Sequence, residues 1–542
     1  MPALRRTFAF VAIALSVVPL IVSAPLLDPD EGLHAAIAQE MVLQHDYVTP
    51  TFLGDPFLDK PILFFWVEAF SLRGFGMNEA AVRLPPLLFG ALGMLSLALL
   101  GVAMFGLNIG LVAGIVYGTM LLPVAISNVA VHDIALVPFM CVAAWCLWRA
   151  SGSRRAWAWG VPAGVCLGLS ILTKGLAGAV FVGIFAGCIA VPAAPKPGGG
   201  GRQPSTIARL ATALTIAGGV AFCLAAPWYV AMERAHPGYL HYYFIERHLR
   251  GYLTSTQRHA GRVWWYYVPI VLGGALPWTG YLASALRHVR RRGERPVISI
   301  AWAWFGLGLL FLSIGESKLV TYVLPIFPAL ALAIAEEIVT FGQSRMGLAI
   351  QIVTLVVLPI ATVIALPFML DAPIGLTWIV PMAAMGGVLL IARRALRATT
   401  IETAIGAGAL MALVSFIAVL TASLPRAAAY LTSRDLAAAL NAGPHLPSRV
   451  AILDERIGSI VFYLSPALRA EATPDRIQIT SLSSAIEHVR VDSPDAILAV
   501  RDGQLRRFTR LFPNPPQPSV RAGTFSVFRA DHLRDALGAN RH

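Results

Sequence analysis

Charged residues are scarce in this chain, and acidic residues are scarcer than basic ones. Only 13% of the 542 residues are charged, with 29 Asp and Glu against 42 Lys and Arg. A soluble protein of this length carries charge at about a quarter of its positions. A larger buried core does not account for the shortage, because single cores stop growing beyond about 250–300 residues. The composition therefore excludes an ordinary soluble protein.

Cysteine is also rare, and none of the cysteines falls in a predicted loop. In apolar stretches they act as small packing residues, so neither a disulfide framework nor a cysteine-bound metal is indicated. The net charge of +13 does not indicate nucleic acid as a partner, because the basic residues form short clusters between apolar runs instead of one basic surface. The five cysteines are Cys141, Cys146, Cys166, Cys188 and Cys223.

Long apolar runs are what the chain has in abundance. A run of about 20 residues crosses roughly 30 Å of hydrocarbon as a helix. The first, from Phe8 to Leu27, follows Arg5 and Arg6. A cleaved signal peptide is the alternative, but Pro25 directly after the only small-residue site favours an uncleaved helix. The other runs cover residues 85–105, 108–126, 133–150, 157–173, 176–195, 207–231, 263–286, 297–315, 319–340, 347–369, 374–392 and 402–424. We predict thirteen membrane-spanning helices.

The basic clusters support this count. With a cytoplasmic N-terminus, every dense cluster falls on the cytoplasmic side, as the positive-inside rule requires. The orientation leaves two long outer loops, 28–84 and 232–262, and places the residues after the last span outside. The clusters lie at 149–155, 196–209, 287–295, 345 and 393–397.

The outer segments carry patterns of their own. In the first loop, Asp28 or Asp30 can cap an amphipathic helix over 31–44. The aromatic stretch 61–75 is too short to span and is expected at the membrane interface. After the spans, residues 426–542 alternate short apolar strands with amphipathic helices, which predicts a small α/β domain.

Ionisable residues at the outer edge of the membrane are the functional candidates, because charge there is costly without a use. Asp28, Asp30 and Glu31 directly follow the first helix; a helix cap and a solvated turn would explain one acid, not three. Asp59-Lys60 begins the aromatic stretch. This lysine either reaches toward lipid headgroups or binds a phosphate.

Further candidates lie on the same predicted face. Asp133 either caps the helix that follows it or belongs to a site, Lys174 is nearly surrounded by apolar sequence, and Tyr322 follows a Glu-Ser-Lys turn. The second outer loop interleaves tyrosines with cations, which suits lipid headgroups or a polyprenyl phosphate. Its charged and histidine residues include Glu246, Arg247, His248, Arg250, Arg258, His259 and Arg262.

Carboxylates and cations together at the outer leaflet fit group transfer from a phosphate leaving group. An acid orients or deprotonates the acceptor, and Lys, Arg or His neutralises the departing phosphate. A transporter would place its polar site near the bilayer midplane on broken helices, where these predicted spans carry almost no charge.

Seven stretches, in one order over roughly residues 1–330, resemble the bacterial aminoarabinose transferases. These enzymes are related to the protein O-mannosyltransferases and have the GT-C glycosyltransferase fold. The stretches are DPDEGLHAAIAQEMVLQHDYVTPTFLGDPFLDKPILFFW, NEAAVRLPP, VHDIALVPF, LTKGLAGAV, APWYVAMERAHPGYLHYYFIERHLRGYL, WWYYVPIVLGGALPW and GESKLVTYVLP. The resemblance implies an all-α GT-C membrane domain with about thirteen spans over 1–425. It does not extend to the small periplasmic α/β domain over 426–542, which is predicted from the residue pattern alone.

The resemblance also implies roles for single residues. Asp30 and Asp133 are the expected catalytic acids. Asp59 stands where the family has a glutamate placed for metal, so a divalent metal ion is one option as cofactor, and no nucleotide is expected. Leu33 stands where the family has an arginine, which leaves His34 to substitute for it in part. The residues expected at the donor phosphate are Lys60, Lys174, His259, Tyr322, His34 and Arg262.

The implied reaction is inverting transfer of a sugar from a polyprenyl (undecaprenyl) phosphate to a periplasmic lipid or envelope glycan. In the family the sugar is aminoarabinose and the acceptor is lipid A. The expected location is the bacterial inner membrane, with many spans, membrane lipids as neighbours and the site facing the periplasm. The alternatives are an enzyme like the protein O-mannosyltransferases, with a polypeptide acceptor, and a lipid or polysaccharide transporter.

Overall fold

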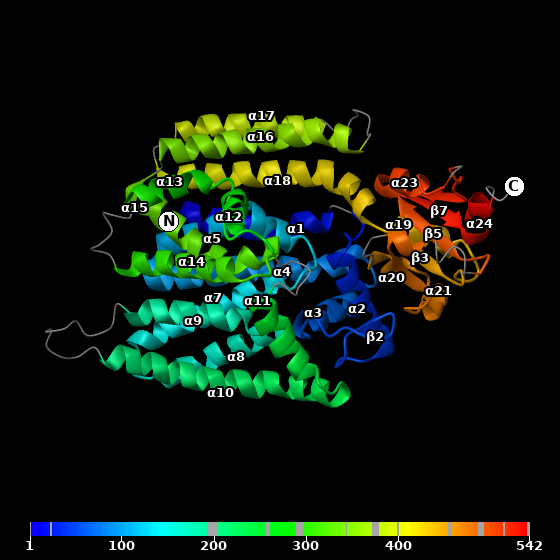
Figure 1. Cartoon of the computed structure of the whole chain (residues 1–542). Helices are drawn as coiled ribbons and strands as arrows, with labels where there is room; N and C mark the ends of the chain where they lie inside the picture. The colour runs from blue at the N-terminus through cyan, green and yellow to red at the C-terminus, as the bar shows by residue number, and fades with distance from the viewer. Residues whose placement is uncertain are drawn as a thin grey trace. The chain divides into compact units, whose positions relative to one another are not determined.

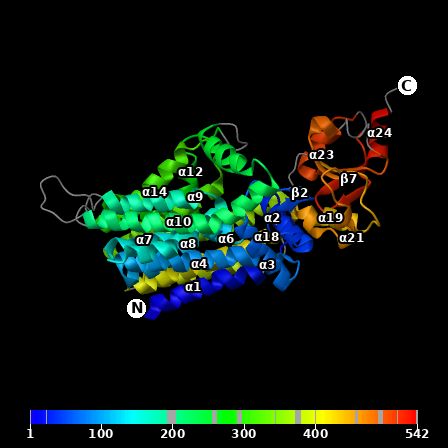
Figure 2. The same cartoon turned by 90° about the horizontal axis from the view of Figure 1, so that it is seen from below.

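The computed structural model is mostly helical (Figures 1 and 2). It describes residues 2–21, 24–191, 204–254, 261–288, 296–342, 344–370, 379–397, 400–453, 458–485, 493–512 and 515–538. The chain divides into two compact units. Unit 1 comprises Met1–Val22, Leu58–Val67 and Arg83–Ser423, and unit 2 comprises Ser23–Phe57, Glu68–Val82 and Leu424–His542.

Every predicted apolar run contains helix where the structure describes it. Through the first 431 residues the helices are α1 (Pro2–Ile21), α2 (Asp30–Gln44), α3 (Leu63–Phe75), α4 (Glu79–Phe105), α5 (Leu107–Gly118), α6 (Leu121–Ser127), α7 (Asp133–Gly152), α8 (Ala156–Lys174), α9 (Ala177–Ala190), α10 (Pro204–Ala235), η2 (His241–Arg250), α11 (Gly251–Leu253), α12 (Tyr267–Gly274), α13 (Thr279–His288), α14 (Pro296–Ile314), η4 (Val320–Ile326), α15 (Phe327–Phe341), α16 (Arg345–Leu370), α17 (Ile379–Leu396) and α18 (Ile401–Leu431).

Several of these helices are long and apolar enough to cross a membrane. Among the described residues there are six such helices, or seven if α5 and α6, which meet at 63°, form one span. A multi-pass membrane protein is therefore confirmed.

Two of the predicted runs form broken helices instead of single spans. The run 108–126 becomes α5 and α6, and the run 263–286 becomes α12 and α13. The two breaks bind each other: the Leu121 N–H donates to the Leu276 carbonyl at 2.8 Å, and the Trp278 indole N–H donates to the Thr119 hydroxyl at 2.9 Å. Backbone and side-chain groups freed by the breaks are thus paired inside the protein, as an apolar surrounding requires.

Close packing of α8 on α10 rests on glycine at every fourth position. A Cβ on Gly160 would lie 2.7 Å from the Ala213 carbonyl oxygen, and one on Gly164 would lie 2.6 Å from that of Ala217. Small residues at this spacing let the backbones of two membrane helices approach each other closely. Helix α8 also packs on α7 (Figure 2).

Unit 2 contains a mixed five-stranded sheet in the order β4-β3-β5-β7-β6. Strand β3 is parallel to β4 and β5, whereas β7 is antiparallel to β5 and β6. Leu453, Leu498, Phe508 and Phe528 belong to its buried core. The strands are β3 (Val450–Leu453), β4 (Ile477–Thr480), β5 (Ile497–Arg501), β6 (Val520–Ala522) and β7 (Phe525–Arg529). The accompanying helices are α19 (Arg434–Asn441), α20 (Ser459–Tyr463), α21 (Pro466–Glu471), α23 (Asp502–Thr509) and α24 (Ala530–Gly538).

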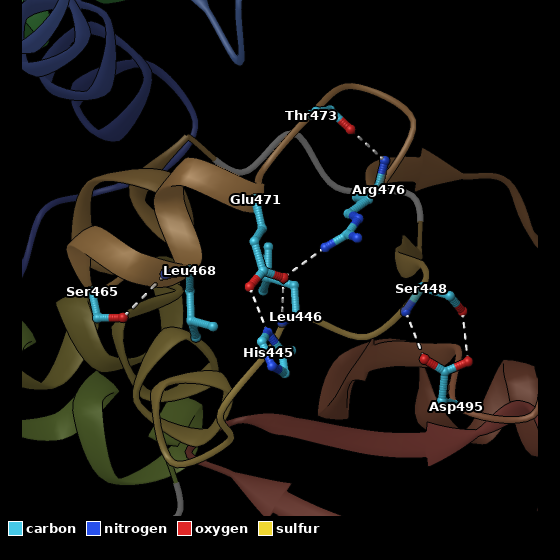
Figure 3. A network of polar contacts seen from close by, with 9 residues as sticks. All are labelled: His445, Leu446, Ser448, Ser465, Leu468, Glu471, Thr473, Arg476 and Asp495. Atoms are coloured by element: carbon cyan, nitrogen blue, oxygen red, sulfur yellow. Dashed lines mark hydrogen bonds and ion pairs between the residues drawn. The ribbon is translucent and has the colours of Figure 1, made fainter.

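Polar contacts fix the turns around this sheet (Figure 3). Glu471 accepts hydrogen bonds from the Leu446 N–H at 3.1 Å and from Arg476 at 2.7 Å, and it pairs with His445. Asp495 accepts from the N–H and the hydroxyl of Ser448, which precedes β3.

The segment 28–84 contains the helix α2 where an amphipathic helix was predicted, followed by the short strands β1 (Thr51–Phe52) and β2 (Asp55–Pro56). Burial of α2 is not confined to one face, so the helix is not amphipathic as predicted. The prediction that Asp28 or Asp30 caps this helix is wrong. Pro29 occupies the N-cap position and makes no side-chain cap. Asp28 instead accepts hydrogen bonds from two serine hydroxyls and two backbone N–H groups elsewhere in unit 2, which use both of its carboxylate oxygens.

The second outer segment, expected to be a loop over 232–262, is largely helical where it is described. Helix α10 continues to Ala235, and His241–Arg250 form the π-helix η2. A π-helix closes i→i+5 hydrogen bonds, and such turns occur often at functional sites.

Candidate functional site

An ion pair in unit 1 joins two of the predicted site residues. Asp133 is the first residue of α7 and Lys174 is the last residue of α8, so the packing of these two helices brings the side chains together. The Lys174 ammonium bonds the buried Asp133 carboxylate. It also lies 4.4 Å from the ring centroid of Tyr322, in η4, which is close enough for a cation–π contact.

A second cluster surrounds Asp59. Its Oδ1 accepts a hydrogen bond from the Tyr242 hydroxyl at 2.6 Å, and its Oδ2 lies 2.9 Å from a guanidinium nitrogen of Arg247. Burial, followed by the bond to Asp59, raises the pKa of Tyr242 to about 12, so the phenol stays protonated and donates.

Lys60 links the two clusters, because it directly follows Asp59 in the chain and its charge acts on Asp133. The Asp133–Lys174 pair and the Asp59–Arg247 pair therefore belong to one region of unit 1. Among the five described side chains named here, Lys60, Lys174 and Arg247 are cations and Asp59 and Asp133 are carboxylates, so this set has one positive charge in excess.

The π-helical register of η2 sets the geometry of this region. Tyr242 and Arg247 are five residues apart and both contact Asp59. In an α-helix, residues five apart point about 140° away from each other. The i→i+5 repeat of a π-helix places them on one side.

The same register pairs Tyr243 with His248. Their rings lie 4.6 Å apart, and His248 Nδ1 is 2.8 Å from the Tyr243 carbonyl oxygen. The Nε2 edge of the imidazole lies against the backbone directly after α8, where a Cβ on Gly175 would clash with the ring. Burial lowers the pKa of His248, so the ring is neutral at pH 7.

The donors around Asp59 do not fit a metal ion. Both carboxylate oxygens are engaged by Tyr242 and Arg247, and a guanidinium occupies the position that a cation would take. Within the part of the chain that the structure describes, no three His, Cys, Asp or Glu side chains gather as metal ligands.

The other predicted site residues are Asp30, His34, Arg262 and His259. Asp30, at the start of α2 in unit 2, is exposed, whereas His34 on the same helix is buried. In unit 1, Arg262 lies 5.6 Å from the Tyr266 ring centroid, and its carbonyl accepts from Lys318 at 3.4 Å. His259 lies outside the described residues.

Tyr242, Arg247 and His248 received no individual roles from the sequence. Their segment was conspicuous for its density of tyrosines and cations, but it was expected to be a loop. The pairing of residues five apart, which defines their contacts, does not follow from an α-helical or a strand period.

A family model described as dolichyl-phosphate-mannose-protein mannosyltransferase matches residues 59–197. Two curated relatives are named undecaprenyl phosphate-alpha-4-amino-4-deoxy-L-arabinose arabinosyl transferases. The protein of Aeromonas salmonicida is 32% identical over 325 residues, which are 58% of this chain and 56% of the relative. That of Proteus mirabilis is 30% identical over 322 residues, 57% of this chain and 55% of the relative. The matched region thus spans little more than half the length of these relatives.

Solved structures extend the likeness of fold over nearly the whole chain. The crystal structure of ArnT from Cupriavidus metallidurans bound to undecaprenyl phosphate has a TM-score of 0.76 at 20% identity, and the match covers 96% of this chain and 97% of that one. The archaeal oligosaccharyltransferase AglB from Archaeoglobus fulgidus is more distant, with a TM-score of 0.51 at 12% identity over 93% of this chain and 69% of that one. The chain is therefore similar in sequence and fold to the aminoarabinose transferases, as its motifs predicted.

Proposed function

We propose that the chain is an inverting glycosyltransferase that uses a polyprenyl-phosphate-linked sugar. The observation that carries the proposal is the cluster of Lys60, Lys174 and Arg247 around Asp59 and Asp133 in unit 1. A phosphate monoester leaving group needs several fixed donors near an apolar surface. The names of the relatives support 4-amino-4-deoxy-L-arabinose as the sugar and undecaprenyl phosphate as its carrier, and we propose lipid A as the acceptor.

The proposed chemistry is a single displacement at the anomeric carbon. Asp30 accepts the proton of the acceptor hydroxyl, and the acceptor oxygen forms the new bond to that carbon from the face opposite the phosphate. The bond between the carbon and the phosphate oxygen breaks, and its electron pair stays on the phosphate. Lys60 and Lys174 stabilise the charge that develops there, with His259, Arg262, His34 and the Tyr322 hydroxyl as further phosphate contacts. Asp133 holds the Lys174 ammonium in place.

The topology of the proposed enzyme follows from the sequence. We propose thirteen spans in the bacterial inner membrane, with the cation cluster open to the periplasm. Residues 1–425 would form the membrane domain and 426–542 a periplasmic α/β domain. The five-stranded sheet within the second region supports this division.

The test is chemical analysis of cells that lack the protein. Mass spectrometry of lipid A, other glycolipids and envelope glycans should show one sugar missing in deletion cells. The wild-type protein should restore this sugar, and an inserted, folded Asp30→Asn variant should not, because it cannot take the acceptor proton. Restoration by Asp30→Asn would contradict the assignment. A sugar missing from a polypeptide would favour the O-mannosyltransferase-like alternative, and movement of a lipid without a new glycosidic bond would favour a transporter.

Metal dependence is tested separately with purified protein. We expect chelation with EDTA, followed by removal of the chelator, to leave transfer unchanged, because Arg247 already neutralises Asp59. Loss of activity that returns with Mg²⁺ or Mn²⁺ would contradict this expectation and place a metal in the site. Addition of a nucleotide sugar without the lipid-linked donor should give no product.

A further inference from the structure

Asp28 is the most heavily bonded of the three acids that open the first outer segment. Its Oδ1 accepts from the N–H groups of Gly458 and Ser459, both at 2.8 Å. Its Oδ2 accepts from the hydroxyls of Ser433 at 2.8 Å and Ser459 at 2.5 Å. All four donors come from residues more than 400 positions later in the chain, and all belong to the same compact unit as Asp28.

Backbone packing reinforces this attachment. A Cβ on Gly32 would lie 2.4 Å from the Ser459 nitrogen, and a Cβ on Gly458 would lie 2.1 Å from the Leu33 nitrogen. The first turn of α2 therefore touches the backbone before α20 directly, with no side chain between them. Ser433 and Ser459 are fully buried, and the Ser433 N–H donates to the Ser459 hydroxyl at 2.9 Å.

Two residues at the end of α20, Phe462 and Tyr463, make further hydrogen bonds to α2 and to the segment that precedes it. The Tyr463 hydroxyl accepts from the Leu26 N–H at 2.8 Å and donates to Glu79 at 2.9 Å. Gln39, halfway along α2, donates to the Phe462 carbonyl at 3.3 Å. Through these contacts α20 fixes both the position and the direction of α2.

Asp30 is the one acid of the three that stays available. It is exposed, whereas Glu31 is buried and accepts from the Leu27 N–H at 2.8 Å. Asp28 is saturated by four donors, so it has no lone pair left for an acceptor substrate. Asp28 and Glu31 therefore accept hydrogen bonds from groups of the protein, whereas the Asp30 side chain is exposed.

We propose that Asp28, Ser433 and Ser459 are positioning residues for the transfer reaction: they lock the first turn of α2 onto α20 and so aim the Asp30 carboxylate. The proposal rests on the proposed function, in which Asp30 takes the acceptor proton. In this proposal the residues from 433 onward contribute to the reaction indirectly: they hold α2, the helix that carries the proposed base Asp30.

The test compares Ser459→Ala with Ser448→Ala. Ser448 donates its N–H and its hydroxyl to Asp495, the same pair of bonds that Ser459 makes to Asp28, but at the start of the sheet (Figure 3). Losing a hydrogen bond to a carboxylate weakens the hold on α2 enough to lower kcat by about tenfold. The donor KM should stay unchanged, since the phosphate contacts remain. Ser448→Ala should leave kcat unchanged.

Hydrogen exchange gives a readout that does not depend on activity. Ser459→Ala should speed amide exchange in residues 30–36, and Ser448→Ala should not. If Ser459→Ala fails to insert, Ser433→Ala, which removes a single hydroxyl, replaces it with the same expectations. The proposal would be overturned if the serine variant left amide exchange in α2 unchanged. It would also be overturned if exchange became faster while the kcat of an active enzyme stayed the same. A wild-type protein with no transferase activity would contradict the proposed function instead, and the exchange comparison would still decide whether α20 holds α2.

Discussion

His248 shows how a single side chain can be tuned by its packing. The ring is wedged between Tyr243 and the backbone at Gly175, and this burial lowers its pKa. At a pH below about 6.5, the ordinary histidine pKa, His248 is protonated in the unfolded chain but stays neutral in the folded protein until the pH is lower still. Unfolding therefore takes up a proton, and the stability of the folded protein falls as the pH decreases through this range.

We expect His248→Gln to remove part of this pH dependence. The melting temperature of the wild-type protein in detergent should fall between pH 7 and pH 5, and the fall should be smaller in the variant. His241→Gln is the control, because that histidine lies on the same π-helix and its side chain is exposed. Parallel pH profiles for wild-type protein and His248→Gln would contradict a neutral, buried His248.

At the scale of helices, the contact between α8 and α10 depends on the absence of a side chain at Gly164. Gly164→Leu should destabilise the folded protein by about 1–3 kcal/mol, the usual cost of overpacking. Gly183→Leu on α9 is the matched control, because nothing lies within 4 Å of the position of its added Cβ. Thermal unfolding in detergent measures both. Equal melting temperatures would show that α8 and α10 can separate without cost.

The sequence predicted most helices because apolar runs near 20 residues leave few alternatives in a membrane. It could not predict the breaks at Thr119 and Leu276, because each break is satisfied by the other across more than 150 residues. The π-helix was missed for a similar reason. Its register is expressed in the contacts of Tyr242 and Arg247 with Asp59, which is far away in the chain.

The candidate site was predictable in its residue types and less so in its pairings. Asp133, Lys174 and Tyr322 were chosen as charged or polar residues at one membrane edge, and the structure brings these three together. A metal ion at Asp59 was one option from the sequence, and the contacts that the structure gives this carboxylate are Tyr242 and Arg247. The sequence shows which charged side chains stand at the edge of the membrane, where their burial costs free energy. It does not show the partner of each, because that depends on how helices distant in the chain pack together.

At the scale of the whole molecule, the proposed reaction has two requirements. Lys60 and Lys174 would bind the leaving phosphate, and Asp30 would take the proton of the acceptor hydroxyl. Lys174→Met should raise the donor KM and lower kcat, because the lysine binds the phosphate and stabilises the charge that develops on it. Asp30→Asn should lower kcat and leave the donor KM unchanged, which steady-state kinetics would show.

The most direct measurement uses the purified full-length protein in lipid nanodiscs. It is incubated with undecaprenyl phosphate-linked 4-amino-4-deoxy-L-arabinose and lipid A, and the products are read by mass spectrometry. We predict lipid A that is heavier by one aminoarabinose residue, together with free undecaprenyl phosphate, for the wild-type protein and neither product for Asp30→Asn. Modified lipid A formed equally by Asp30→Asn, or no transfer by the wild-type protein to lipid A or any envelope acceptor, would contradict the account.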